Sequence, residues 1–180
     1  MKNKRLPKLT IIALAALLLS CSQESTGPAT NAGKVSFKPL TFAQWSEQLG
    51  NYRNKVVVVD LWATWCLPCI ERFPKMVDLN NKYADDRVAF VSINFDDAED
   101  TESLQKAEGF LQDVGAEFDN FYFNENLIDA FEHMAIIALP TVVIFNQGGA
   151  ESRRLTNTNP NKQFTAQDIE TEIERLLASN

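Results

Sequence analysis

Residues 56–69 read VVVVDLWATWCLPC, and this stretch decides the fold. Its first half, residues 56–62, is almost entirely apolar and rich in valine, which predicts a strand buried on both faces of a sheet. A helix is expected to begin near Cys66 and to run on through Cys69. Pro68 suits the first turn of that helix, because proline lacks an N–H that would have no partner there. The stretch therefore predicts a strand, a turn and a helix that carries two cysteines at its start.

The rest of the chain alternates between short strand-like runs and amphipathic helical runs. Further strands are predicted over residues 88–95, 118–123, 141–146 and 151–156, and the last two are expected to form a hairpin. The helix that begins near Cys66 is expected to reach about residue 83 with a bend at Pro74. Other helices are predicted over residues 41–50, 103–114, 126–133 and 165–178. This order indicates an α/β sandwich with a mixed central β-sheet flanked by helices. One domain over residues 35–180 accommodates all of these elements.

Residues 1–20 are similar to the signal peptide of a bacterial lipoprotein. A basic start precedes an apolar run over residues 9–19, which is shorter than the roughly 20 residues that a membrane-spanning helix needs. The run ends in Leu-Leu-Ser-Cys, which resembles a lipobox and implies that the chain is cut before Cys21 and that Cys21 is lipidated. Residues 21–34 are then the lipidated cysteine and a flexible tether. Ordinary signal cleavage beside an incidental cysteine is the alternative.

A lipid anchor predicts a protein of the cell envelope that faces the periplasm. Two or three acyl chains bind a membrane stably, whereas one binds only weakly. Ser22 follows the lipidated cysteine, and the sorting tendency of lipoproteins then favours the outer membrane over the inner one.

The charge of the chain argues against a nucleic-acid partner. The 180 residues include 17 Lys and Arg against 24 Asp and Glu, a net charge of −7. Four of the basic residues lie in residues 1–20, so the mature chain keeps 13 against 24, a net charge of −11. Such a surface repels phosphates.

The pair Cys66 and Cys69 allows three interpretations: a metal site, a structural staple or a redox centre. A closed zinc site needs four ligands, and the chain offers one such pair and a single histidine, His133. A staple would close a very small loop and stabilise little. The redox interpretation is favoured, because the first turn of a helix brings residues three apart to the spacing of a disulfide. The helix N-terminus favours a reactive thiolate at Cys66, and Cys69, one turn deeper, is expected to be the more buried, resolving thiol.

The strand, the turn and WC-x-P-C resemble the active site of thioredoxins. The run ATWC-x-P-C with a following Phe-Pro is similar to the extracytoplasmic branch of TlpA and ResA. The resemblance covers residues 50–146 well and implies a thioredoxin-like fold in which Cys66 and Cys69 cycle between dithiol and disulfide. It also identifies Pro140, in Ala-Leu-Pro-Thr, with the cis-proline that faces the cysteines and pairs with substrate backbone.

Asp60 interrupts the apolar strand six residues before Cys66. A carboxylate there is expected to be buried with a raised pKa, and it matches the acid that in thioredoxins helps to move the proton of the resolving cysteine. A strand-end acid that reaches solvent is the alternative. The TlpA and ResA branch often has glutamate at the position of Arg72. We therefore expect Asp60 to handle the proton alone and Arg72 to lower the pKa of a nearby thiol.

Apolar side chains around the cysteines are the candidate substrate contacts. They are Trp65, Leu67, Pro68, Ala138 and Leu139, with Trp62 and Phe73 either joining them or belonging to the core. Two further features are expected to be structural: His133, and an acidic run over residues 96–102 that we interpret as a solvated helix start.

These observations predict a thiol–disulfide oxidoreductase that reduces disulfides of exported proteins. Leu67-Pro68 lacks the histidine that strongly oxidising relatives place between their cysteines. The partners implied by the resemblance are protein disulfides and a membrane thiol-reductase that donates electrons; no cofactor and no metal are expected. The rivals are a weak oxidase or isomerase on the same fold, and a non-catalytic binding lipoprotein.

Overall fold

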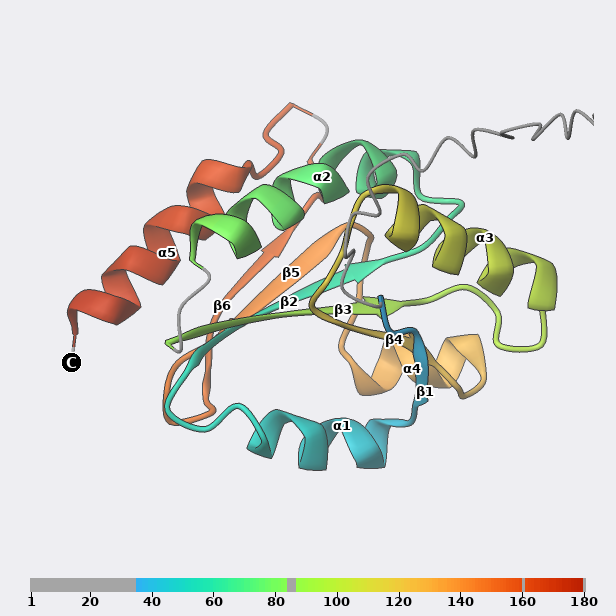
Figure 1. Ribbon diagram of the computed structural model, residues 1–180, viewed down its shortest axis with the longest axis horizontal. Helices are drawn as coiled ribbons and strands as arrows, with labels where there is room; N and C mark the ends of the chain where they lie inside the picture. The colour runs from blue at the N-terminus through green and yellow to red at the C-terminus, as the bar shows by residue number, and fades with distance from the viewer. Residues whose placement is uncertain (1–34, 84–86, 160, 180) are drawn as a thin grey trace, which may run out of the picture. The chain divides into compact units, whose positions relative to one another are not determined.

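The computed structural model describes residues 35–83, 87–159 and 161–179 (Figure 1). The strands are β1 (Lys38–Leu40), β2 (Val56–Trp62), β3 (Val88–Asn94), β4 (Asp119–Phe123), β5 (Thr141–Phe145) and β6 (Glu151–Thr156). The helices are α1 (Phe42–Gly50), α2 (Leu67–Lys82), α3 (Thr101–Asp113), α4 (Leu127–His133) and α5 (Ala166–Ala178). Within these ranges no helix combines the length and the apolar character needed to cross a membrane.

The six strands form one mixed sheet in the order β1-β4-β3-β2-β5-β6. The pairs β1–β4, β4–β3 and β3–β2 are parallel, whereas β2–β5 and β5–β6 are antiparallel. β2 therefore lies inside the sheet with a neighbour on each side. The carboxyl ends of β2 and β3 meet at one edge, and the loop that carries Cys66 leaves from this edge.

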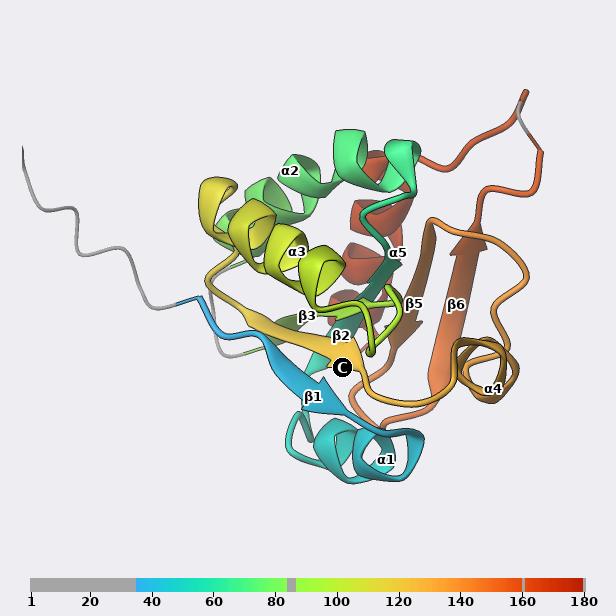
Figure 2. The same ribbon diagram turned by 90° about the vertical axis from the view of Figure 1, so that its right-hand side faces the viewer.

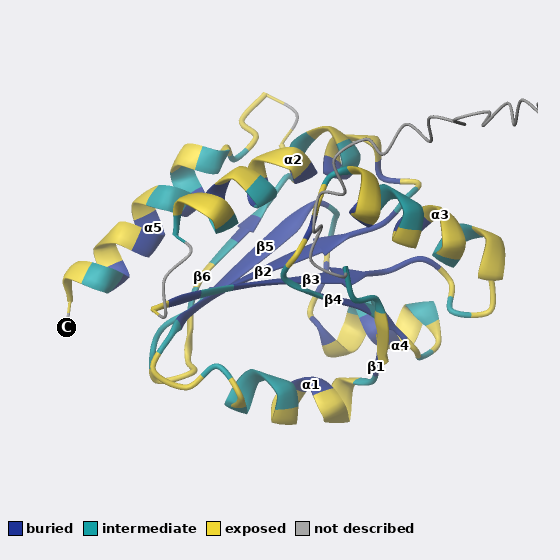
Figure 3. Cartoon of the chain, in the orientation of Figure 1, coloured by how far each residue is buried: buried dark blue, intermediate teal, exposed yellow. Residues whose placement is uncertain are grey.

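The helices cover both faces of the sheet. α2, α3 and α5 lie on one face, and α1 and α4 lie on the other (Figures 1 and 2). β2 is buried along its whole length between them (Figure 3). Because successive side chains of a strand point to opposite faces, odd-numbered residues such as Val57 and Leu61 pack in the core with Trp45 of α1. Even-numbered ones such as Val58 pack in the core under α2 and α5.

This alternation places Asp60 on the face that α2 and α5 cover. It is the even-numbered residue between Val58 and Trp62, and it is fully buried. The strand thus carries one carboxylate directly beneath the helix that begins at Cys66.

The predicted fold class is confirmed, and the strands and helices lie close to their predicted bounds. α1 begins after Thr41, where the side chains of Thr41 and Gln44 form a capping box. α5 begins after Thr165, whose backbone N–H donates to Asp168 at 2.7 Å. α2 runs through Pro74 to Lys82. The strand that the sequence did not predict is β1, which has only three residues and pairs with β4 at the edge of the sheet.

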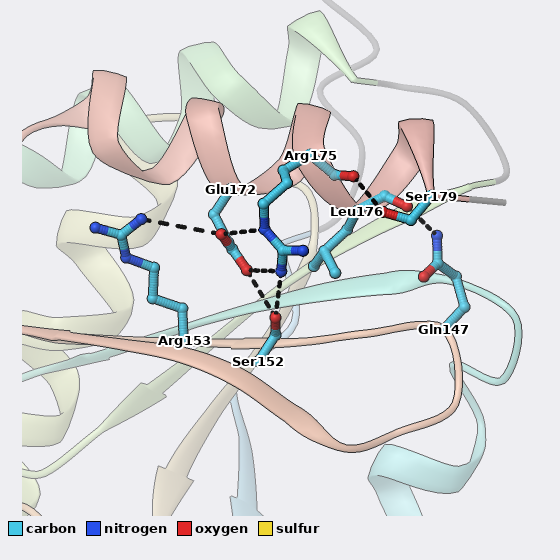
Figure 4. A network of polar contacts seen from close by, with 7 residues as sticks. All are labelled: Gln147, Ser152, Arg153, Glu172, Arg175, Leu176 and Ser179. Carbon is cyan, nitrogen blue, oxygen red and sulfur yellow. Dashed lines mark hydrogen bonds and ion pairs between the residues drawn. The ribbon is translucent and has the colours of Figure 1, made fainter.

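A buried carboxylate ties α5 to the edge strand β6 (Figure 4). Glu172 accepts hydrogen bonds from Ser152 Oγ at 2.6 Å and from Arg175 Nη2 at 2.6 Å and Nε at 3.0 Å. The guanidinium of Arg153 lies 3.9 Å away. The hydrogen bond from Arg175 is the main cause that lowers the pKa of Glu172 below its ordinary value, against burial, which raises it.

Glu172→Gln is expected to reduce the free energy of unfolding by about 1–2 kcal/mol at neutral pH, because a hydrogen-bonded charge is lost from the contact between α5 and β6. A lowered native pKa adds stability that is present above the unfolded pKa and is lost as the pH falls through the native value. The difference in the free energy of unfolding between Glu172→Gln and the native chain should therefore shrink below pH 4.5. Urea titrations between pH 3 and pH 7, with the exposed Glu47→Gln as the control, measure this; a constant difference would contradict it.

Candidate active site

The two cysteines form a disulfide at the N-terminus of α2. The Sγ atoms of Cys66 and Cys69 are 2.02 Å apart and the Cα atoms 5.2 Å apart. Cys66 is the N-cap residue, and the backbone N–H of Cys69 donates to its carbonyl oxygen at 2.9 Å. Cys66 is 5% exposed and Cys69 is not exposed. The order of burial is the one predicted, with Cys66 on the outer side.

At the N-terminus of α2, the described residues place no negatively charged side chain next to Cys66. Within the described ranges no side chain caps this helix, and its first turn carries no acidic residue. Unpaired N–H groups and the helix dipole favour a negative charge at such a position. In the dithiol form, the sulfur of Cys66 is thus the atom on which a thiolate is stabilised.

A buried carboxylate after β3 holds the loop before Cys66. Asp96 accepts from the backbone N–H of Thr64 at 3.1 Å and from its hydroxyl at 2.8 Å, and Asn94 Nδ2 donates to it at 2.8 Å. The residues between β2 and α2 form a turn that the N–H of Cys66 closes on Ala63 at 3.1 Å. Asp96 therefore fixes the turn that positions Cys66 and its neighbour Trp65.

This role of Asp96 corrects one prediction. The acidic run over residues 96–102 was expected to be a solvated helix start, but Asp96 is 2% exposed. Only the later part fits, where Asp100 caps α3. The strand register offers a signal for this contact. Trp62 lies opposite Asn94 at the end of the parallel pair, and continuing that register by two residues brings Thr64 level with Asp96.

The segment before β5 borders the same region. The peptide bond between Leu139 and Pro140 is cis. Thr141 Oγ1 donates to the carbonyl of Ala138 at 2.7 Å, which holds the turn, and Leu139 packs against the core cluster that contains both cysteines. Pro140, the residue identified by the resemblance, thus directly follows Leu139, whose side chain contacts the cluster that contains both cysteines.

Asp60 is paired with Arg72, which lies one turn beyond Cys69 on α2. Arg72 Nη2 donates to Asp60 Oδ1, and the guanidinium also stacks 5.2 Å from the ring of Phe164. The burial predicted for Asp60 is confirmed. The sequence predicts that Asp60 alone handles the proton and that Arg72 lowers the pKa of a nearby thiol, and both stay predictions. The structure adds that Arg72, three residues after Cys69, reaches the strand below the helix and pairs with Asp60.

Burial dominates the electrostatics of this pair. It raises the pKa of Asp60 above its ordinary value, while the charge and the hydrogen bond of Arg72 act in the opposite direction. Asp60 Oδ2 and two nitrogens of Arg72, Nε and Nη1, are buried and have no hydrogen-bond partner among the described residues. Oδ2 is therefore a buried oxygen that is free to accept a proton.

The candidate substrate contacts divide into three groups. Trp65, Leu67 and Pro68 are exposed, and Ala138 and Leu139 are half-buried. Trp62 and Phe73, which the sequence left open, are core residues with no exposed surface. Cys21 lies outside the described residues. His133 stacks on Phe42 with ring centres 4.9 Å apart, and its Nδ1 lies 3.1 Å from Glu125.

In the part of the chain that the structure describes, no group of three or more His, Cys, Asp or Glu side chains is placed to hold a metal ion. What is assembled at the end of β2 is a disulfide, a helix N-terminus, a cis-proline turn and a buried carboxylate with a free oxygen. These groups suit thiol–disulfide exchange, in which a thiolate attacks a disulfide and a second thiol resolves the product.

Comparisons with known proteins give the same class. A thioredoxin-like family model matches residues 54–151, and the chain belongs to this family. The chain is 25% identical over 154 residues to the thiol-disulfide oxidoreductase ResA of Geobacillus kaustophilus, covering 85% of this chain and 81% of that one. It is 33% identical over 86 residues to the thioredoxin-like protein YneN of Bacillus subtilis, covering 48% of this chain and half of YneN.

Solved structures share the fold. A putative thiol:disulfide interchange protein DsbE from Chlorobium tepidum superposes with a TM-score of 0.58 at 25% identity, over 72% of this chain and 84% of that one. A thiol-disulfide isomerase from Corynebacterium glutamicum gives 0.60 at 16% identity, over 71% and 84%. With the Cys66–Cys69 disulfide, the family and these relatives support thiol–disulfide oxidoreductase activity.

Thr64→Val is expected to lower the free energy of unfolding of the oxidised protein by about 1.5–3 kcal/mol, the range for a hydrogen bond to a charged group. Valine keeps the shape of threonine and the backbone N–H but lacks the hydroxyl that reaches Asp96. Thr64→Ser keeps the hydroxyl and should lose less than half as much. Chemical denaturation compares the two variants, and equal losses would show that the hydroxyl contact does not hold the loop.

Proposed function

We propose that this thiol–disulfide oxidoreductase reduces disulfides of exported proteins. The observation that carries the proposal is the disulfide itself, with Cys66 at the uncapped helix N-terminus and Cys69 buried beneath it. Leu67-Pro68 between the cysteines favours the reducing direction, since it places no additional cation beside the thiolate. A thiolate that is less strongly stabilised makes the dithiol the better electron donor.

The reaction begins from the dithiol form. The thiolate of Cys66 attacks one sulfur of a client disulfide, a mixed disulfide forms, and the other client sulfur leaves as a thiolate. The thiol of Cys69 then loses its proton and attacks Cys66 Sγ. This breaks the mixed disulfide, releases the second client thiolate and leaves the Cys66–Cys69 disulfide. Two electrons pass from the protein to the client.

Asp60 is the group proposed to take the proton of Cys69. It lies on the face of β2 that α2 covers, it is fully buried, and its Oδ2 is free. Arg72 holds Oδ1 and opposes the rise in the pKa of Asp60 that burial causes. The charge of Arg72 thus favours the ionised carboxylate, the form that accepts a proton, against the effect of burial.

The cycle requires a donor that reduces the Cys66–Cys69 disulfide again. The proposed donor is a membrane thiol-reductase, as the resemblance implies. In support, the chain is 29% identical over 147 residues to the thiol:disulfide interchange protein DsbD of Colwellia psychrerythraea, covering 79% of this chain and 20% of that one. A domain of this type thus forms part of a larger interchange protein.

The proposed location is the periplasmic side of the cell envelope, with the protein anchored through lipid on Cys21. The support is the sequence alone: a basic start, an apolar run of residues 9–19 and the Leu-Leu-Ser-Cys ending. The outer membrane is preferred because Ser22 follows the cysteine.

The direction of electron flow is decided by the midpoint potential of the Cys66–Cys69 pair. Equilibration with glutathione is expected to give a value near that of thioredoxin, about −270 mV, as suits a reductant. A value near about −120 mV, that of a strong oxidant, would exclude the reducing role while leaving the exchange activity intact.

The pH dependence of the resolving step tests the Asp60–Arg72 pair. A base acts when deprotonated, so the rate at which Cys69 releases a preformed mixed disulfide should rise with pH through the pKa of Asp60, which lies above 3.8. Asp60→Asn should remove this rise and slow the step about tenfold or more. Arg72→Met should shift the rise to higher pH, because the charge that lowers the pKa of Asp60 is gone.

The two variants control for one another. Both break the same ion pair, so a loss caused by misfolding would affect both in the same way. Superimposable pH profiles of Asp60→Asn and the native chain would remove Asp60 from the mechanism.

Cys21→Ser is expected to release the protein from the membrane fraction, because the acylated residue is lost. Fractionation of cells and intact mass measurement of the native chain check this, with an acyl mass on the native protein only. Equal membrane binding of both proteins would overturn the anchor.

A further inference from the structure

An apolar groove lies beside the disulfide, outside the residues that thiol chemistry requires. Its walls come from Trp65, from α4, including Ile128 and Glu132, and from the segment that leads to the cis-proline turn, including Ile136 and Ile137. The groove has a volume of about 540 Å³. Trp65, the residue next to Cys66 in the sequence, is one of the lining residues, so the groove borders the site of attack.

Exposed apolar side chains gather at this groove. The large apolar side chains that are most exposed in the described residues are Trp65 (60%), Leu67 (65%), Ile128 (69%) and Ile137 (79%). Three of these four line the groove, and Leu67 follows Cys66 directly. A single exposed apolar residue is ordinary, but a contiguous patch beside a reactive group indicates a contact surface.

The walls of the groove are fixed by the core rather than by a partner. Phe131 packs edge-on to Phe95 with ring centres 5.5 Å apart, and Ala130 and Met134 of the same segment are buried. Ala135 has a φ of 50°, so the chain turns sharply there. After this turn Ile136 points inward and Ile137 outward, at 7% and 79% exposure. The exposed side chains are thus presented on a rigid support.

The rim of the groove is acidic. An adjoining hollow shares Leu127 and Ile128 with it and is lined by Asp97, Glu99 and Glu125, while Glu132 lines the groove itself. Neither hollow has a lysine or arginine among its described lining residues. Glu125 Oε2 lies 3.1 Å from His133 Nδ1. Arg154, which donates to the carbonyl of Met134, is paired with Glu151, so the lining side chains offer a ligand carboxylates and no unpaired arginine.

We propose that the groove selects the clients of this enzyme: polypeptides in which an apolar side chain stands beside the cystine and a lysine or arginine follows a few residues away. The apolar side chain would occupy the groove and the basic residue its rim while Cys66 attacks. A second copy of this chain fits poorly, because its net charge, −7 for the full sequence and −11 without residues 1–20, brings like charges together. The inference rests on the proposed exchange activity and specifies its substrate.

The test uses four synthetic peptides, each with one internal disulfide. The residue next to the attacked cysteine is Leu or Ser, and a residue three positions further is Lys or Glu. The prereduced protein is mixed with each peptide and single-turnover rates are measured, with two electrons passing from the dithiol to the peptide disulfide. The small, uncharged hydroxyethyl disulfide is the control substrate, because it can react with Cys66 without occupying the groove.

Leu is expected to raise the second-order rate constant about tenfold over Ser, because it buries apolar area. Lys is expected to raise it about fivefold over Glu at low ionic strength, and this preference should fade with added salt. Ile137→Ser and Ile128→Ser should reduce the Leu preference at least threefold. The exposure of both side chains makes these variants compatible with folding, which circular dichroism verifies.

The acidic rim has its own matched pair of variants. Glu99→Gln with Glu132→Gln should abolish the Lys preference. Glu47→Gln with Glu108→Gln changes the net charge equally at exposed sites outside both hollows and should leave the preference unchanged. None of these variants should alter the rate with hydroxyethyl disulfide.

Failure of the two proposals gives different results. If the native protein does not reduce hydroxyethyl disulfide, the exchange activity itself is wrong. If it does but all four peptides react alike, or if the variants keep the native preferences, the groove does not select clients. Concentration-dependent dimerisation that Ile137→Ser abolishes would assign the groove to a second copy and also overturn the inference.

Discussion

The burial of β2 on both faces is the constraint on which the rest of the site depends. All seven residues of this strand are inaccessible, and helices cover them on either side. The chain can therefore leave the sheet only at the end of the strand, where the loop to Cys66 begins. The same burial makes a charge on Asp60 costly, and Arg72, its ion-pair partner among the described residues, comes from the helix above it. The positions of the two cysteines, of the Asp60 carboxylate and of α2 thus all depend on how β2 is packed.

Local patterns predicted most helices and strands well, because the signal for each of these elements lies in consecutive residues. The run of valines, the caps at Thr41 and Thr165, and the strand–turn–helix around WC-x-P-C all follow from neighbours in the sequence. β1 escaped prediction because three residues carry no period and the strand exists only through pairing with β4.

The parts of the site that sequence did not predict are contacts between distant segments. Thr64 and Asp96 are 32 residues apart, and only the register of β2 against β3 brings them together. Arg72 was interpreted by comparison with an acid at its position, yet its length lets it reach across to β2, a contact that no local pattern encodes. The groove beside α4 likewise depends on the turn at Ala135, where a residue other than glycine takes a left-handed conformation.

The elements that hold the cystine and those that form the groove are anchored in different parts of the core. The cysteines pack with α2 and α3, whereas α4 rests on the opposite face of the sheet. Substitutions in α4 and the segment after it can therefore accumulate without disturbing the environment of the sulfur atoms. If the groove selects clients as proposed, electron transfer and partner choice rest on separate parts of one scaffold, and a change in one need not change the other.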